Sequence, residues 1–497
     1  MTASPDITTL GALKQGGYTP KSVKQELRDN LIAHMGTDAP LFEGVLGYDT
    51  TVIPDVQRAL LSRHSMILLG LRGQAKTRIA RQMTDLLDEW IPAVAGSEMN
   101  DDPLQPLSRY AKDLIAEKGD ETPITWLHRS DRYVEKLATP DVSVADLIGD
   151  VDPIKAANMG LDYSDERVLH FGLIPRSHRC IFAINELPDL QPRIQVSLFN
   201  ILQEGDIQIR GFQLRLPLDI QFVFTANPED YTNRGAIITP LKDRIQSQIL
   251  THYLTDLNLS QSVTTQEAQL HAQQHDRVQV PGLLAELVER ISQEARQSEF
   301  IDQKSGVSAR LTISAYENLV SAAERRALIN GEERTRARIS DLVGVVPAIT
   351  GKIELVYEGE QEGPWNVAMR LIGAAIRTKF PQLFPDPEGI RRRGGDNPYM
   401  TTVAHFNSHE LDLPLDASED AYRKALSSVP GLKALVTKYV PGAGEDDKYT
   451  WMEFALHGLA ENSLINKSVL DDTVSFSDLL NQMFSGGDDE EVDPYSN

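Results

Sequence analysis

The chain has little of several features that would point to particular compartments. It contains one cysteine, Cys180, so no disulfide can form within it, which is typical of a reducing compartment. No run of about 18 uninterrupted apolar residues occurs, so we expect no membrane span. The first ten residues lack both a basic and an apolar segment, so we expect no secretory signal peptide. Together these absences predict a cytoplasmic protein.

Positive charge is also scarce. The chain has 49 Lys and Arg residues against 72 Asp and Glu residues, which gives a formal net charge of −23 at pH 7. Such a surface repels phosphate backbones over long range, so nucleic acid is a poor default partner. The length of 497 residues allows about three domains.

Short apolar runs alternate with helical segments in the first half of the chain. The runs are MILL at 66–69, CIFAI at 180–184 and IQFVFTA at 220–226. This alternation predicts an α/β domain with a parallel sheet flanked by helices. The sequence after about residue 258 shows mainly helical periodicity, and the chain ends in a run of acidic residues. We expect a helical lead-in at 1–40, an α/β domain at 41–257 with an insertion at about 92–135, a helical lid at 258–354, a mostly helical extension at 355–485 and an acidic disordered tail at 486–497.

The most informative motif is SMILLGLRGQAKTRIARQM at 65–83. An apolar strand runs into a turn, then Lys-Thr, then an amphipathic helix, which approximates the phosphate-loop pattern G-x-x-x-x-G-K-[ST]. Ala75 stands at the second glycine, and we expect alanine to fit there only if its φ is negative or the loop adjusts. Backbone N–H groups and the lysine would bind ATP phosphates, and the threonine hydroxyl would reach Mg²⁺. The candidate nucleotide-binding residues are Gly70, Leu71, Arg72, Gly73, Gln74, Ala75, Lys76 and Thr77.

A second strand, CIFAINE at 180–186, ends in Asn-Glu. Phosphate-loop ATPases place an acidic pair at such a strand end, where one acid holds Mg²⁺ and the other polarises the attacking water. Glu186 suits the second role, and Asn185 stands where an aspartate is expected. Because a neutral amide brings no charge to the metal, we expect weaker metal binding or slower turnover. The candidate metal site comprises Thr77, Asn185 and Glu186.

Three more polar residues follow in chain order. Asn227, after the strand at 220–226, can orient the lytic water, and Arg244 can stabilise transition-state charge in a neighbouring subunit. Arg310 opens a predicted helix and can contact nucleotide phosphates. A lone arginine is usually a solvated surface group, so the order and spacing of the whole set carry the argument.

These residues, in this order, resemble the AAA+ superfamily and, more narrowly, the clade of MoxR ATPases and the magnesium chelatase motor subunit. GLRGQAKT resembles the MoxR phosphate loop, in which alanine before the lysine is common. HFGLIPRSHRCIFAINELPDL at 170–190 is similar to the chelatase stretch that leads into the acidic strand. GVSARLTISAYENLVSAAERRAL at 306–328 resembles the second sensor region. The resemblance covers about 41–345 and leaves the remainder unplaced.

The resemblance implies a homo-hexameric ring with ATP sites between subunits, and a partner that carries a von Willebrand A domain. It also implies a β-hairpin at 206–220. The family roles that it implies are sensor 1 for Asn227, the arginine finger for Arg244, sensor 2 for Arg310 and an adenine-side position for Gly47.

Three functions stay open at this point. The first is an ATPase that remodels a protein partner or assists metal or cofactor insertion. The second is the motor subunit of a tetrapyrrole metal chelatase. The third is a hydrolysis-poor scaffold in which ATP only orders assembly, because Asn185 replaces the expected acid. An AAA+ transcriptional activator is disfavoured, since the sequence shows neither a GAFTGA-like loop nor a basic terminal helix-turn-helix.

Overall fold

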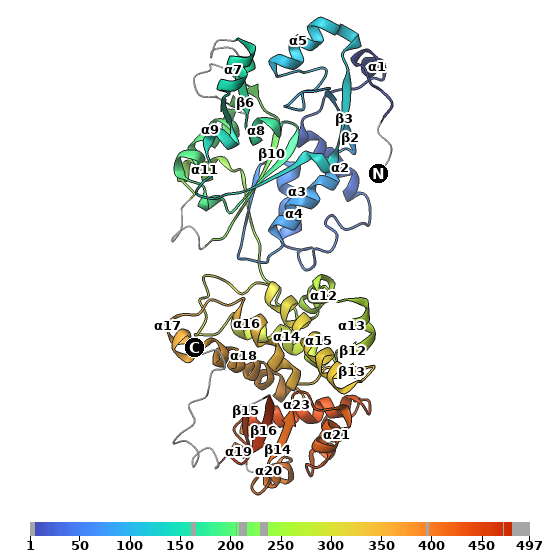
Figure 1. Cartoon of the computed structure of the whole chain (residues 1–497), viewed down its shortest axis with the longest axis vertical. Helices are drawn as coiled ribbons and strands as arrows, with labels where there is room; N and C mark the ends of the chain where they lie inside the picture. The colour runs from blue at the N-terminus through green and yellow to red at the C-terminus, as the bar shows by residue number, and fades with distance from the viewer. Residues whose placement is uncertain are drawn as a thin grey trace. The chain divides into compact units, whose positions relative to one another are not determined.

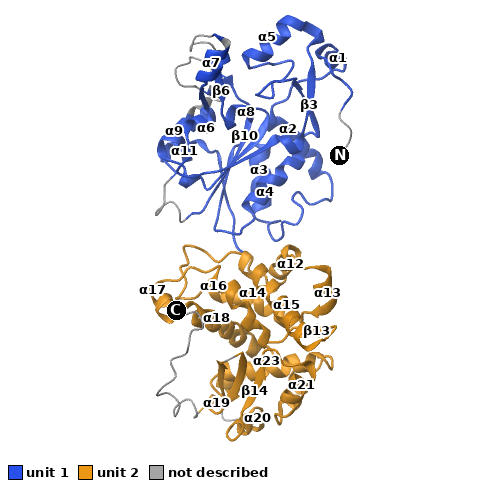
Figure 2. Ribbon diagram, in the orientation of Figure 1, with its two compact units in different colours: residues 1–253 blue, residues 254–497 orange. Residues whose placement is uncertain are grey.

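The computed structural model describes residues 5–160, 166–204, 206–207, 216–228, 237–393, 397–470 and 472–479. The chain divides into two compact units, residues 1–253 and 254–497 (Figure 2). Each unit has its own hydrophobic core.

A five-stranded parallel sheet lies at the centre of unit 1. Its strands lie in the order β11 (Ser247–Leu250), β1 (Met66–Leu69), β10 (Ile220–Ala226), β7 (Cys180–Asn185) and β4 (Tyr133–Leu137). Every neighbouring pair is parallel. The three apolar runs of the sequence form β1, β7 and β10, which are the interior strands. This parallel sheet confirms the predicted α/β fold class, and the largely apolar sequence of its interior strands is typical of strands that are covered on both faces.

Helices cover both faces of this sheet (Figure 1). The helices on one face are α2 (Val23–Met35), α3 (Val52–Leu61) and α4 (Lys76–Gln82). The larger helices on the other face are α9 (Pro192–Glu204) and α11 (Thr239–Arg244), with α6 (Val144–Leu147) and α8 (Leu173–Arg176) beside them. Phe182 and Phe224 of the sheet share a core with α9 and α11.

Short antiparallel strand pairs interrupt the α/β alternation. They join β2 (Trp90–Val94) to β3 (Ile124–His128), β5 (Gly149–Val151) to β6 (Leu169–Phe171), and β8 (Asp206–Ile207) to β9 (Leu216–Pro217). β3 and α5 (Arg109–Lys118) fall within the predicted insertion at about 92–135, but β2 begins before the insertion and the insertion's last residues belong to β4 of the central sheet. The helix α7 (Pro153–Met159) follows β5. The β8–β9 pair is the base of the predicted hairpin, and residues 208–215 lie outside the described part of the chain.

The predicted helical lead-in packs into unit 1. It forms α1 (Leu10–Gln15) and the whole of α2, and both helices bury leucines. Arg132 donates two hydrogen bonds of 2.7 Å to the carboxylate of Glu26 in α2, and both side chains are buried. This bidentate pair ties the lead-in to the residue before β4.

Unit 2 is mostly helical, and its described residues also form a three-stranded sheet and a parallel two-stranded pair, β12 (Val278–Gln279) with β13 (Thr335–Arg336). Its longer helices are α12 (Leu257–Glu267), α14 (Gly282–Ala295), α15 (Arg310–Asn330), α18 (Pro364–Lys379), α21 (Glu419–Ser427), α22 (Leu432–Tyr439) and α23 (Asp447–Glu461). Its shorter helices are α13 (Ala272–Arg277), α16 (Val346–Thr350), α17 (Tyr357–Glu362), α19 (Pro387–Arg393) and α20 (Met400–Phe406). The strands β14 (Leu411–Pro414), β16 (Thr473–Ser477) and β15 (Asn466–Leu470) form an antiparallel sheet in that order. The extension predicted as mostly helical thus also contains a sheet.

One core runs through unit 2 from Val278 to Phe476, so the segments 258–354 and 355–485 share it. The predicted acidic tail at 486–497 lies outside the described residues. Across the described ranges, every helix falls short of the length or the hydropathy that a membrane span requires.

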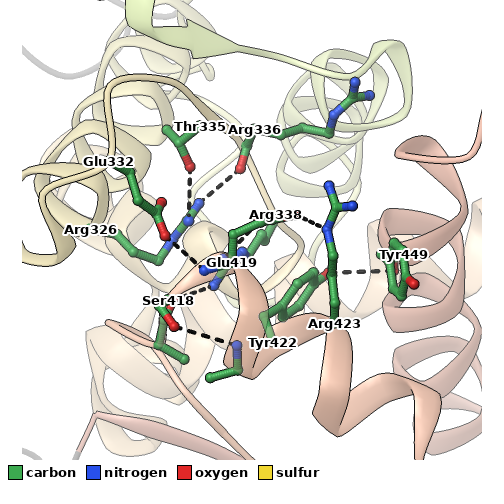
Figure 3. A network of polar contacts seen from close by, with 12 residues as sticks. Arg326, Glu332, Thr335, Arg336, Arg338, Ser418, Glu419, Tyr422, Arg423 and Tyr449 are labelled. Carbon is green, nitrogen blue, oxygen red and sulfur yellow. Dashed lines mark hydrogen bonds and ion pairs between the residues drawn. The ribbon is translucent and has the colours of Figure 1, made fainter.

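A buried polar network also joins these two segments (Figure 3). Arg326 donates to Asp341 at 2.9 Å, and Arg338 donates to Glu419 at 2.8 Å. The guanidinium of Arg338 lies 4.0 Å from the centroid of the Tyr422 ring. Both arginines are almost fully buried, so the loss of either acidic partner would leave an uncompensated charge in the core.

Candidate functional site

The carboxyl ends of β7, β10 and β1 lie side by side in the sheet. After β1 the chain crosses to β4 at the far edge and returns through β7 and β10, while β11 lies on the other side of β1. The connection that leaves β1 therefore runs one way across the sheet, to β4, and the connection that leaves its neighbour β10 runs the other way, to β11. Ligands of open parallel sheets bind outside the carboxyl ends of the strands at such a switch point.

The segment Gly70–Ala75 forms the turn between β1 and α4, as the motif predicted. The Nζ of Lys76 donates to the carbonyl oxygen of Gly70 and, at 2.8 Å, to that of Leu71. Lys76 is only 9% exposed, so its ammonium group is held within the turn. A fixed cation enclosed by a turn suits the oxygens of a phosphate group.

Residues from beyond β11 brace this turn. Thr251 Oγ1 donates to Gln74 Oε1 at 2.6 Å, and Tyr253 OH donates to the carbonyl oxygen of Arg72 at 3.0 Å. A Cβ at Gly70 would lie 1.9 Å from Thr251 Oγ1 and 2.1 Å from Gln74 Oε1. Only glycine fits at position 70, because the bracing pair occupies the space of a side chain.

The predicted adenine-side segment also contacts the turn. Tyr48, directly after Gly47, places its hydroxyl 3.2 Å from the carbonyl oxygen of Gln74 and 2.7 Å from that of His252. Burial raises the pKa of Tyr48 to about 12, so the phenol stays protonated and donates. The loop at 47–48 thus joins the turn to the end of β11.

Ala75 adopts the left-handed conformation, with φ 55° and ψ 12°. Of the two alternatives expected for this alanine, a negative φ or an adjusted loop, the negative φ is therefore wrong. The turn reverses direction immediately before α4, and Gly73 also has a positive φ of 73°. Left-handed residues in such a turn bring successive backbone N–H groups onto one side, which favours anion binding. An alanine in this conformation carries a strain of roughly 1–2 kcal/mol.

Asn185 and Glu186 lie at the end of β7, next to Thr225 of β10. The Oγ1 of Thr225 donates to Asn185 Oδ1 at 3.1 Å and accepts from the backbone N–H of Glu186 at 3.3 Å. Glu186 also adopts a left-handed conformation, with φ 55° and ψ 49°. One threonine therefore fixes the backbone at the point where the chain leaves the strand and presents its acid.

Asn227 follows β10 directly and is 5% exposed. The carbonyl oxygen of the preceding Ala226 accepts a hydrogen bond of 3.1 Å from the backbone N–H of Gly70. Since β10 lies between β1 and β7, Asn227 stands between the turn and Glu186 in the sheet order.

The two candidate arginines belong to other elements, α11 and α15. Arg244 ends α11, where it donates to Gln203 Oε1 at 2.9 Å and to the carbonyl oxygen of Pro240 at 2.8 Å. Its guanidinium lies 5.0 Å from the ring centroid of Phe199. Arg310 opens α15 in unit 2, as predicted, and is exposed. Within the chain itself, Arg244 lies on the α9 side of the sheet rather than at the turn.

Sequence reasoning missed three residues that organise the site. Thr251 braces the turn, Thr225 fixes Asn185 and Glu186, and Glu135 on β4 accepts a hydrogen bond from Asn185 Nδ2. Thr225 was the easiest to find, because it is the one hydroxyl in the run IQFVFTA, whose other side chains apart from Gln221 are apolar. Thr251 and Glu135 gave no such indication, since they sit in mixed polar segments.

No family model matches the chain. Solved structures that match part of the chain include the NtrX protein of Brucella abortus, with 13% identity, a TM-score of 0.31, and 56% of this chain and 53% of that chain covered. Another is a proposed ATPase from Cytophaga hutchinsonii, with 16% identity, a TM-score of 0.30, and 74% and 98% covered. A third is from the complex of the magnesium chelatase subunits BchI and BchD, with 18% identity, a TM-score of 0.30, and 62% and 93% covered.

The chain thus spans about half the length of the NtrX structure it matches. All three scores lie below 0.5 and all three identities below 20%. The functional case therefore depends on the chain's own residues.

Proposed function

We propose that the chain is a Mg²⁺-dependent ATPase of the AAA+ class, allied to MoxR ATPases and the magnesium chelatase motor subunit. One observation carries the proposal. Adjacent residues of β10 contact both halves of the site, since Thr225 bonds to Asn185 and Glu186 while Ala226 bonds to Gly70. The phosphate turn and the strand-end acid therefore flank one strand, as nucleotide hydrolysis requires.

Each residue has a distinct role in this proposal. Lys76 and the N–H groups of the turn bind the β- and γ-phosphates. Glu186 accepts a hydrogen bond from the attacking water, which Asn227 helps to orient. The water oxygen forms a bond to the γ-phosphorus as the bond to the departing ADP oxygen breaks. Arg244 of a neighbouring subunit and Arg310 stabilise charge on the phosphates.

The residues at the strand ends suit Mg²⁺ with bound nucleotide. Mg²⁺ takes few protein ligands when phosphate oxygens and waters complete its shell. Thr77 and Asn185 offer neutral oxygens and Glu186 a carboxylate. In the described part of the chain, no group of three or more His, Cys, Asp or Glu side chains forms a metal cluster, which agrees with a metal that arrives with nucleotide. The ion would neutralise charge that develops on the phosphates.

We further propose that the protein works in the cytoplasm as a hexameric ring that remodels a partner with a von Willebrand A domain. The exposed surface position of Arg310 and the placement of Arg244 away from its own turn support sites completed between subunits. A tetrapyrrole chelatase motor is the narrower alternative. A hydrolysis-poor scaffold is the other, and the neutral Asn185 favours it.

Steady-state ATP hydrolysis by the full chain tests the proposal. We expect turnover that Lys76→Ala and Glu186→Gln each lower by at least about 100-fold. Lys118→Ala and Glu117→Gln, at exposed positions of α5, are matched controls and should keep the parent rate. A parent that binds ATP without turnover, alone and with a von Willebrand A partner, would exclude the motor and leave the scaffold.

A further inference from the structure

Asn185 lies in contact with an acid from the neighbouring strand. Its Nδ2 donates to Oε1 of Glu135, the middle residue of β4. In the β4–β7 register, Glu135 is opposite Ala183 and Leu137 is opposite Asn185, so Glu135 and Asn185 occupy the same face of the sheet. The small side chain of Ala183 leaves room for this diagonal contact.

Glu135 is also joined to the phosphate turn through its helix. Arg81 of α4 donates from Nε and Nη2 to Glu135 Oε2 at 2.9 Å and 2.8 Å. The carboxylate is largely enclosed, with 22% of its side chain exposed, whereas Arg81 is mostly exposed. The acid therefore bridges the end of β7 and the helix that begins with Lys76.

Both ends of the Asn185 amide are engaged. The oxygen accepts from Thr225 and the nitrogen donates to Glu135. A carboxylate at position 185 could accept from Thr225 but could donate nothing to Glu135. Two carboxylates would then be in contact, and such like charges repel. Positions 135 and 185 therefore accommodate one acid between them, and in this chain it is Glu135 of β4.

We propose that Glu135 supplies the negative charge for Mg²⁺-nucleotide that position 185 lacks, with Asn185 held between Glu135 and Thr225 as a neutral intermediary. This inference rests on the proposed ATP site. Glu135 acts as a positioning residue through Asn185 and Arg81. The acid expected at position 185 of β7 is thus replaced by an amide, and Glu135 on the neighbouring strand β4 provides an acid in its place. The asparagine is therefore compatible with a working site.

Four forms of the full chain test this exchange: the parent, Glu135→Gln, Asn185→Asp and the double variant with both changes. The probe is a fluorescent ADP derivative, titrated over a series of Mg²⁺ concentrations and once without metal. The readouts are the Mg²⁺ concentration that gives half of the metal-dependent gain in affinity, and the thermal midpoint without nucleotide.

We expect Glu135→Gln to raise the required Mg²⁺ about tenfold, as changes behind a metal ligand commonly do, while metal-free nucleotide binding stays the same. Asn185→Asp alone should lower the thermal midpoint, because two carboxylates come into contact. The double variant should recover the midpoint and bring the Mg²⁺ requirement back to within about threefold of the parent. Glu117→Gln, the exposed control, should change neither readout.

The outcomes separate the two proposals. A parent that binds no nucleotide overturns the proposed function and this inference with it. If the parent binds and Glu135→Gln leaves the Mg²⁺ requirement unchanged, the inference alone is wrong. A Glu135→Gln variant that only loses thermal stability shows a structural bridge and also overturns it, as does a double variant no better than Asn185→Asp.

Discussion

Thr251 Oγ1 donates a hydrogen bond of 2.6 Å to Gln74 Oε1, across 177 residues of sequence. The donor follows β11 and the acceptor lies in the turn after β1, and both side chains are almost fully buried. Because β11 pairs with β1, Thr251 at the end of β11 lies beside the turn that follows β1. The shape of the phosphate turn thus depends on a strand outside the motif.

Thr251→Val should weaken this brace without a change of side-chain shape. It leaves Gln74 Oε1 buried without its donor, and such a loss costs about 1–3 kcal/mol. We expect urea denaturation to show this loss of stability, with nucleotide affinity reduced several-fold. Thr125→Val, at an exposed position of β3, should stay within about 0.5 kcal/mol of the parent. Equal effects of the two substitutions would show that the Thr251 bond is unimportant.

Ala75→Gly should stabilise the protein, which is unusual for a glycine substitution. Glycine relieves the left-handed strain of roughly 1–2 kcal/mol but loses about 0.5–1 kcal/mol to unfolded-state entropy. The net gain is about 0.5–1 kcal/mol in the free energy of unfolding. Ala80→Gly, in the buried interior of α4, has no such strain to relieve and should destabilise by about 1 kcal/mol. Changes of the same sign at both positions would rule out strain at Ala75.

The interior of the sheet was predictable from sequence and its edges were not. β1, β7 and β10 are fully or almost fully buried, so their apolar runs stand out. β4 and β11 are edge strands with the sequences YVEKL and SQIL. Their polar residues interrupt the apolar run that would indicate a strand. The small sheet of β14, β15 and β16 was not predicted for the same reason. Its strands are short and half-exposed, and they lie among helices in the sequence.

The candidate site shows the same division. Lys76, Glu186 and Asn227 were predicted from a recognisable chain order, because Lys76 follows the turn after β1 and the other two directly follow β7 and β10. Thr251 and Glu135 were missed because each acts across a strand pair on a residue distant in sequence. The left-handed conformation of Ala75 could not be inferred either, since nothing local to an alanine demands a positive φ.

Glu289 gives unit 2 a measurable pH dependence. Burial raises the pKa of its carboxyl to about 7, although the hydroxyl of Thr264 and the charge of Arg296 oppose the shift. Because the folded-state pKa lies above the unfolded value, ionisation costs stability as pH rises from about 4.5 to 7. Glu289→Gln cannot ionise, so its stability relative to the parent should rise by about 2 kcal/mol between pH 5 and pH 8. Denaturation curves of both proteins at several pH values measure this difference. A difference that stays constant with pH would contradict the assignment.

Equilibrium binding of Mg²⁺ and ADP to the full chain, by calorimetry, tests the central claim most directly, because it asks whether the turn from Gly70 to Thr77 binds phosphate. The enclosed ammonium of Lys76 predicts one site per chain and a loss of at least about 100-fold in affinity for Lys76→Ala. Lys118→Ala, on the exposed face of α5, should bind as the parent does. Equal affinity of the parent and Lys76→Ala, or no binding by either, would contradict the account.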